Sequence, residues 1–121
     1  MKVLHIDDSP GMCELYEDMF TLYHHSVKSV NSGKEGLELA LKNDYDLILL
    51  DIDLPDYTGV QFLRDLKNKR PSELLKVVVL SVLKFTKTEI KKLLKFGIHS
   101  VESKPSDFQT IMDLQRNIML N

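Results

Sequence analysis

The sequence contains one cysteine, Cys13, and it has no CxxC pair or Cys/His cluster. A single cysteine cannot form a disulfide within the chain, and no ligand spacing suggests structural zinc. The sequence also lacks an apolar run of the roughly 18 residues that a membrane-spanning helix needs. Its first residues, MKVLHIDD, contain no apolar region typical of a signal peptide. We therefore expect a cytoplasmic protein in a reducing environment.

Neither sign of charge dominates the composition, which has 16 Lys and Arg against 18 Asp and Glu and a net charge of −2. Nucleic-acid and membrane-surface binding usually require a strong basic excess, so we expect neither as a direct partner. The length of 121 residues is close to the commonest domain size, and 43% of the residues are hydrophobic. We expect one globular domain over residues 1–121.

Short apolar segments alternate with amphipathic segments along the whole chain. The continuous apolar runs LILL and VVVL are typical of parallel strands that are covered on both faces. The segment SVKSV alternates polar and apolar residues, which favours an edge strand. The expected strands are Lys2–Ile6, Ser26–Val30, Asp46–Leu50, Lys76–Leu80 and His99–Glu102.

Capping signals mark where the intervening helices begin. A Ser or Thr followed three residues later by Glu or Gln forms a capping box, as at Ser32–Glu35, Thr86–Glu89 and Ser106–Gln109. Leu114 falls outside the apolar stripe of the last helix, so a partner surface and a buried position are equally good interpretations for it. Five strands and five helices in strict alternation predict an α/β fold, with a doubly wound parallel sheet between two helical layers.

Polar residues follow four of the expected strands. In chain order they are Asp7 and Asp8, Asp51 and Asp53, Ser81, and Lys104. The carboxyl ends of parallel strands meet at one edge of the sheet, where open α/β sheets bind ligands. Converging carboxylates repel one another, and a hard cation such as Mg²⁺ relieves this repulsion. With a lysine and a hydroxyl added, the set suits a phosphoryl group on an aspartate.

The segments IDDS, LILLDIDLPDYTG, VVVLS and ESKP occur in this order at the strand ends. With them, the whole chain resembles the receiver domain of two-component response regulators, the CheY-like family. Each segment alone is weakly specific, whereas the four together are highly specific. The resemblance implies a flavodoxin-like fold with strand order 2-1-3-4-5.

The resemblance also implies a role for each residue of the set. Asp51 would accept the phosphoryl group. Asp8 would bind Mg²⁺ directly, Asp7 largely through a water molecule, and Asp53 through its main-chain carbonyl.

Two further positions match residues that act on the phosphoryl group in this family. Ser81 stands at the position of the switch Ser or Thr, and Lys104 at the position of the lysine that pairs with the phosphate. The expected donor is a histidine kinase or a phosphotransfer protein. The expected output is a protein-interaction surface on the fourth helix, fifth strand and fifth helix, and the sequence leaves a homodimer open. Such a domain takes part only in its own phosphorylation and dephosphorylation, so we expect no enzyme.

Three features depart from the family pattern. Val82 follows Ser81 where a small residue is usual, and Val101 replaces the usual switch Tyr or Phe. The side chain of Asp53 adds a negative charge whose effect on the kinetics has no predicted sign. These departures motivate a second hypothesis, a degenerate receiver that acts as a constitutive scaffold.

Lysines recur along the fourth helix and the residues that flank it. They are Lys84, Lys87, Lys91, Lys92 and Lys95, with Glu89 as the only acid among them. A solvated helix face is the common interpretation of such a strip, and a docking surface for an acidic partner is the other.

The D-x-D of Asp51 and Asp53 raises a third hypothesis, a phosphatase of the haloacid-dehalogenase type. Those enzymes place Thr or Val two residues after the second Asp, where this chain has Pro55. They also need a longer chain, usually with a cap module. Turnover of a generic phosphate ester would distinguish them from a receiver.

Overall fold

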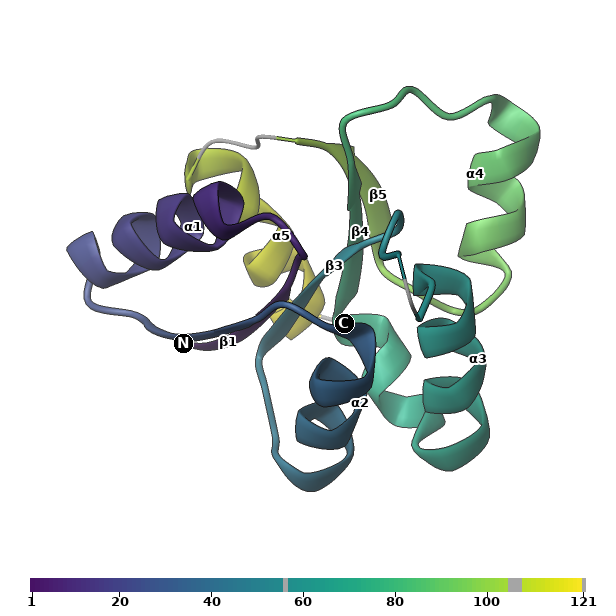
Figure 1. The fold of residues 1–121 in the computed structure, drawn as a ribbon, viewed down its shortest axis with the longest axis horizontal. Helices are drawn as coiled ribbons and strands as arrows, with labels where there is room; N and C mark the ends of the chain where they lie inside the picture. Colours follow the sequence, from purple (N-terminus) through teal and green to yellow (C-terminus); the bar gives the residue numbers. More distant parts are fainter. Residues whose placement is uncertain (56, 105–107, 121) are drawn as a thin grey trace.

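The computed structural model describes residues 1–55, 57–104 and 108–120. Within these residues, five strands alternate with helices along the chain (Figure 1). The strands are β1 (Lys2–Ile6), β2 (Ser26–Val30), β3 (Leu47–Asp51), β4 (Val77–Ser81) and β5 (Ser100–Ser103). The helices are α1 (Pro10–Leu22), α2 (Gly33–Lys42), α3 (Gly59–Lys69), the 3₁₀ segment η1 (Pro71–Lys76), α4 (Lys87–Leu94) and α5 (Phe108–Leu120).

The five strands form one parallel sheet in the order β2-β1-β3-β4-β5. This order confirms the predicted fold class, and β2 lies at an edge as its alternating sequence indicated. Three of the strands begin and end one residue later than predicted. Because of this shift, Asp51 and Ser81 are the last residues of β3 and β4 rather than the first residues after them.

Two helical layers cover the sheet, with α1 and α5 on one face and α2, α3 and α4 on the other (Figure 1). Successive residues of each central strand serve opposite faces. In β3, for example, Leu47 and Leu49 pack with α1 and α5, whereas Ile48 and Leu50 pack with α2 and α3. The apolar run LILL is fully buried because both of its faces are covered.

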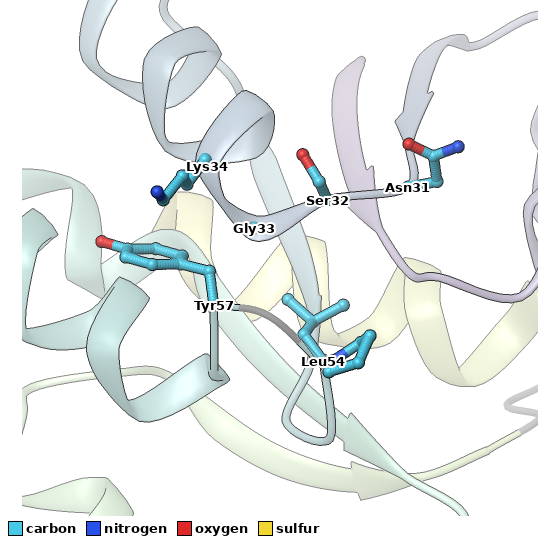
Figure 2. Close-up of a pocket in the computed structure, with 7 residues that line it drawn as sticks. Asn31, Ser32, Gly33, Lys34, Leu54 and Tyr57 are labelled. Carbon is cyan, nitrogen blue, oxygen red and sulfur yellow. The ribbon is translucent and has the colours of Figure 1, made fainter.

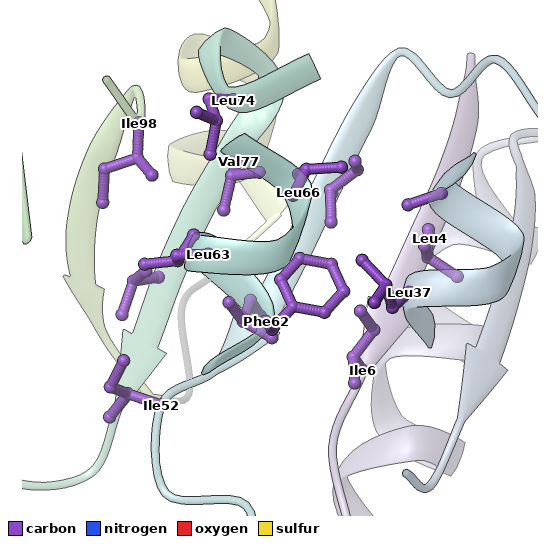
Figure 3. Packing of buried hydrophobic residues seen from close by; sticks show 14 of the residues in the cluster. Leu4, Ile6, Leu37, Ile52, Phe62, Leu63, Leu66, Leu74, Val77 and Ile98 are labelled. Atoms are coloured by element: carbon purple, nitrogen blue, oxygen red, sulfur yellow. The ribbon is translucent and has the colours of Figure 1, made fainter. Parts of the chain in front are cut away.

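The larger of the two apolar clusters lies between the sheet and helices α2, α3 and α4. Phe62 of α3 and Leu37 of α2 belong to it together with Ile6 of β1, as Figure 3 shows. Phe62 is fully buried. Burying a side chain of this size contributes about 1.5–3 kcal/mol to the free energy of folding.

Leu114 belongs to the smaller cluster and not to a partner surface. It is 9% exposed and packs with Ile111 of α5 and Tyr16 of α1. Its burial resolves the two interpretations in favour of the core. The helical pattern alone did not place it because α5 presses against both α1 and the sheet, which widens the buried face beyond one narrow stripe.

Capping geometry agrees with the sequence at two helix starts. The hydroxyls of Ser32 and Thr86 each accept a hydrogen bond from a main-chain N–H of the first turn. Ser106, predicted to cap the last helix, lies outside the described residues, as does Pro105 of the ESKP segment. Among the described residues, no helix combines the length and the apolar character needed to cross a membrane.

Candidate acidic site at the carboxyl edge of the sheet

Three carboxylates meet where β1 and β3 end. Asp7 and Asp8 directly follow β1, and Asp51 is the last residue of β3. Each offers a carboxylate oxygen within 4.8 Å of the others. Asp7 is fully buried, Asp51 is 4% exposed and Asp8 is exposed, so the cluster opens to solvent on the side of Asp8.

Lys104 provides the positive charge within this cluster. Its main-chain N–H donates a hydrogen bond of 2.9 Å to the carbonyl of Ser81, which extends the pairing of β5 with β4 by one residue. Its Nζ atom then lies 2.9 Å from Oδ2 of Asp7 and 3.3 Å from Oδ2 of Asp51. Burial alone would lower the pKa of Lys104, but the hydrogen bonds and charges of the two aspartates outweigh it and raise the pKa. Lys104 therefore stays protonated.

The two oxygens of Asp51 have different partners. Oδ1 accepts a hydrogen bond of 3.0 Å from the main-chain N–H of Asp53, and Oδ2 faces Lys104. Burial raises the pKa of Asp51, the Asp53 N–H and Lys104 oppose this effect, and the charge of Asp7 adds to it. A carboxylate held in one orientation and desolvated on one side is suited to act as a nucleophile.

Ser81 is buried at the end of β4, and its hydroxyl bonds to Asp53 rather than to Asp51. Its Oγ donates to Oδ2 of Asp53 over 3.4 Å and accepts the main-chain N–H of Leu83 over 3.1 Å. The Asp53 side chain thus reaches the predicted switch residue. The sequence had suggested only that it adds negative charge nearby.

His5 is a polar residue of this site that sequence analysis missed. It is fully buried in β1, and its Nε2 lies 3.9 Å from Oδ2 of Asp7 without a hydrogen-bond partner among the described residues. Its Nδ1 contacts the Ser29 hydroxyl at 3.2 Å, and its ring lies 4.5 Å from that of Tyr16. Burial lowers the pKa of His5 to about 4. The sequence carried one signal for this placement. His5 lies two residues before Asp7, and residues two apart along extended backbone point to the same face of the sheet.

Asp7, Asp8 and Asp51 fit a hard divalent cation. All three offer carboxylate oxygens, the donor type that Mg²⁺ prefers, and the exposure of Asp8 leaves room for the waters that Mg²⁺ retains. The only cationic group that contacts them among the described residues is Lys104, and its single charge cannot neutralise three carboxylates.

The two valines that depart from the family pattern occupy different environments. Val82 is 63% exposed, so most of its side chain lies in solvent. Val101 of β5 is half-buried and packs against the larger cluster. Because valine stands at position 101 where the family usually has an aromatic residue, the side chain between β5 and α4 is short.

A separate hollow of about 280 Å³ lies between the β2–α2 and β3–α3 connections (Figure 2). Residues 31–34 line it together with Leu54, Pro55 and Tyr57. Gly33 is required here, because a Cβ at this position would lie 2.7 Å from the Tyr57 ring. The described residues that line the hollow include none of the three clustered aspartates, so it is distinct from the acidic site.

Comparison with known proteins supports the same class as the fold and the site. The response regulator receiver domain family matches residues 3–116, so this chain belongs to that family, whose members are signalling domains of two-component systems. The cell cycle response regulator CtrA of Brucella ovis is 33% identical over 108 residues, which cover 87% of this chain and 44% of CtrA. The CtrA of Brucella anthropi matches equally well. This chain thus spans less than half the length of these relatives.

Solved structures share the fold at lower sequence identity. A two-component response regulator from Clostridium difficile superposes with a TM-score of 0.85 at 21% identity, covering 100% of this chain and 97% of that one. The chemotaxis response regulator CheY4 of Vibrio cholerae gives a TM-score of 0.79 at 24% identity, with 97% of each chain covered. These similarities confirm the flavodoxin-like receiver fold.

Proposed function

We propose that residues 1–121 form a single receiver domain in which Asp51 accepts a phosphoryl group in the presence of Mg²⁺. The observation that supports this most directly is the environment of Asp51. Its carboxylate is nearly buried, is oriented by the Asp53 N–H and lies 3.3 Å from the Lys104 ammonium, beside two further carboxylates. A merely structural aspartate at a strand end has no need of this surrounding charge.

Asp7, Asp8, Asp51 and the main-chain carbonyl of Asp53 are the proposed ligands of Mg²⁺. When bound, the cation neutralises charge on the phosphoryl oxygens and on the three carboxylates. Asp7 is held in place from two sides, because Oδ1 accepts the N–H of Ser9 at 2.9 Å and Oδ2 accepts from Lys104.

In the proposed reaction, one carboxylate oxygen of Asp51 attacks the phosphorus of the donor. An O–P bond forms on Asp51 as the N–P bond of a phosphohistidine breaks, and the imidazole leaves with the electron pair and takes up a proton. Lys104 pairs with a phosphoryl oxygen, and Ser81 turns its hydroxyl from Asp53 toward the new phosphoryl group. Positioning and charge neutralisation account for most of the catalysis in transfers of this type.

The proposed donor is a histidine kinase or a phosphotransfer protein, and the proposed output is a protein partner at α4, β5 and α5. Neither nucleic acid nor a membrane is needed in this scheme. A homodimer through the same surface is the alternative output. Phosphorylation must favour one conformation by a few kcal/mol to make a minor population dominant.

Intact-mass measurement after incubation with acetyl phosphate and Mg²⁺ tests the acceptor directly. We expect one phosphoryl adduct on the wild type, no adduct on Asp51→Asn, and no adduct when EDTA replaces Mg²⁺. Asp53→Asn is the matched control, because it removes a nearby exposed carboxylate and keeps the main-chain carbonyl and N–H. An adduct that survives on Asp51→Asn would overturn the assignment.

The scaffold hypothesis is supported by Val101, which replaces the family's switch aromatic. A constitutive scaffold would keep its fold and show no Mg²⁺-dependent spectral change when beryllofluoride is added. We expect a change in the amide NMR signals around Ser81 and Lys104 instead. Hydrolysis of a generic phosphate ester, which a phosphatase would catalyse, should be absent.

A further inference from the structure

His5 is held in one orientation beside the acidic site, and the proposed reaction gives it no role. It stands opposite Ser29 in the pairing of β1 with β2, and its Nδ1 lies 3.2 Å from the Ser29 hydroxyl. The Tyr16 ring packs against the imidazole, with 4.5 Å between the ring centroids. These contacts fix the ring so that its other nitrogen, Nε2, lies 3.9 Å from Oδ2 of Asp7.

The surroundings of the imidazole place its proton on Nε2. Full burial keeps the ring neutral, so one nitrogen carries a hydrogen and the other is an acceptor. The Ser29 hydroxyl is placed to donate to Nδ1. In the opposite tautomer the lone pair of Nε2 would face the Asp7 carboxylate, which is repulsive. The N–H group of the imidazole therefore faces Asp7.

This Nε2–H group has no hydrogen-bond partner among the described residues. A buried donor without a partner is unfavourable, because it has lost water and gained nothing in exchange. Leu4 and Ile6, the neighbours of His5 in β1, are fully buried and carry no such polar group. An unpaired donor beside a carboxylate thus calls for a second state of the site in which it is used.

Asp7 is the residue whose partners change in the proposed reaction. Its Oδ2 accepts a hydrogen bond of 2.9 Å from the Lys104 ammonium. When Lys104 pairs with a phosphoryl oxygen on Asp51, Oδ2 of Asp7 loses this donor at a position that is closed to solvent. The 3.9 Å between Nε2 and Oδ2 is about 1 Å longer than a hydrogen bond, so a small rotation of the Asp7 side chain closes it.

We propose that His5 is a positioning residue that takes over Oδ2 of Asp7 when Lys104 turns to the phosphoryl group. Its Nε2–H donates to Oδ2, while the Ser9 N–H keeps Oδ1. Asp7 thereby stays oriented toward the proposed cation site throughout the transfer. His5 touches neither the phosphoryl group nor the cation and acts only through Asp7. The inference rests on the proposed function, because it requires Lys104 to change its partner.

NMR of the imidazole in wild-type protein with isotope-labelled histidine tests this exchange of partners. Beryllofluoride on Asp51 stands in for the phosphoryl group, and loss of signals in His5→Phe identifies those of His5. We expect the Nε2–H tautomer with Mg²⁺ alone. Adding beryllofluoride should move the Nε2–H proton signal downfield, because a charge-assisted hydrogen bond to a carboxylate forms.

Mg²⁺ titrations followed by amide NMR signals separate positioning from a structural role. Without beryllofluoride Lys104 holds Asp7, so His5→Phe should bind Mg²⁺ within about twofold of the wild type. With beryllofluoride, His5→Phe should bind Mg²⁺ roughly tenfold or more weakly, as expected for the loss of a hydrogen bond to a charged group. His5→Gln offers an amide N–H in place of Nε2–H and should recover most of this affinity.

His99→Phe is the matched control. The His99 imidazole is half-buried and contacts the Ser100 hydroxyl at 3.0 Å, directly before β5 and thus at the opposite end of that strand from Lys104. This variant should leave both Mg²⁺ affinities within about twofold of the wild type. An equal loss of affinity in His5→Phe with and without beryllofluoride would mean that His5 only supports the fold, and would overturn the inference.

Two NMR outcomes would also overturn it. They are an Nδ1–H tautomer of His5, and an Nε2–H signal that stays in place while the amide signals around Ser81 and Lys104 respond to beryllofluoride. Either outcome contradicts the role of His5 alone and leaves the acceptor assignment intact. If beryllofluoride changes no signal of the wild type, the proposed function fails and this inference fails with it.

Discussion

Lys104 lies closer to Asp7 than to Asp51, with its Nζ atom 2.9 Å from the first carboxylate and 3.3 Å from the second. The lysine thus neutralises part of the charge that a cation would neutralise at the same site. We expect Lys104→Met to lower the free energy of unfolding in EDTA by about 3–5 kcal/mol, because two buried carboxylates lose their partner. Denaturant unfolding by circular dichroism measures this change.

Added Mg²⁺ should stabilise Lys104→Met more than the wild type, since the cation no longer competes with an ammonium group. Lys95→Met removes an exposed lysine beyond α4 and should behave as the wild type in both conditions. Equal stabilisation of wild type and Lys104→Met by Mg²⁺ would show that Lys104 and the cation do not share these carboxylates. Lys104→Met should also lose the phosphoryl adduct in the mass measurement.

The sheet and its acidic edge were predictable from the sequence because both depend on local patterns. Runs such as LILL and VVVL are buried on both faces in any parallel sheet, and strand ends meet at one edge whatever the helices do. The convergence of Asp7 and Asp51 therefore followed from their positions alone. The strand order came from the family resemblance and not from the pattern.

Features that depend on contacts between distant segments were not predictable. Ser81 bonds to Asp53 because the two strand ends are adjacent in three dimensions, and neither residue type specifies that partner. His5 is buried beside Asp7 because α1 places Tyr16 over it, which no local pattern reveals. Leu114 is buried because two elements cover it.

Gly36 of α2 packs directly on Ile6 of β1. A Cβ at position 36 would lie 2.4 Å from Cδ1 and 2.6 Å from Cγ1 of Ile6, which is fully buried. Gly36→Ala should therefore destabilise the protein by about 1–3 kcal/mol, although alanine favours helix in solution. Gly11→Ala in α1 meets only Ser9 Oγ at 3.9 Å and should be neutral or stabilising by up to about 1 kcal/mol.

Ile6→Val provides a test of the contact itself. Removing Cδ1 relieves part of the overlap, so the double variant Gly36→Ala/Ile6→Val should lose less stability than the sum of the two single variants. Chemical unfolding of the four proteins measures this coupling. Strict additivity would mean that Gly36 is required for another reason.

Arg70 joins the end of α3 to the end of α2. Its Nη1 donates to the carbonyls of Ala40 at 2.9 Å and Asn43 at 2.8 Å, and it lies 3.5 Å from buried Glu73. Arg70→Ala removes two charge-assisted hydrogen bonds and should cost about 2–3 kcal/mol of unfolding free energy. Arg64→Ala replaces an exposed arginine within α3 and should change the unfolding free energy by less than about 0.5 kcal/mol. Similar values for the two variants would contradict this role.

The buried imidazole of His5 makes stability depend on pH in a direction that follows from its pKa. Burial lowers this pKa from 6.5 to about 4, so below pH 6.5 the unfolded chain binds a proton that the folded chain does not. Stability is therefore lost as the pH falls from about 6.5 toward 4, and the loss from this group reaches about 2 kcal/mol at about pH 5.

Urea unfolding in EDTA at several pH values measures this loss of stability. His5→Gln removes the titrating group, so its unfolding free energy should fall by about 2 kcal/mol less than that of the wild type between about pH 7.5 and 5. Parallel curves for the two proteins would show that His5 is accessible to protons in the folded state.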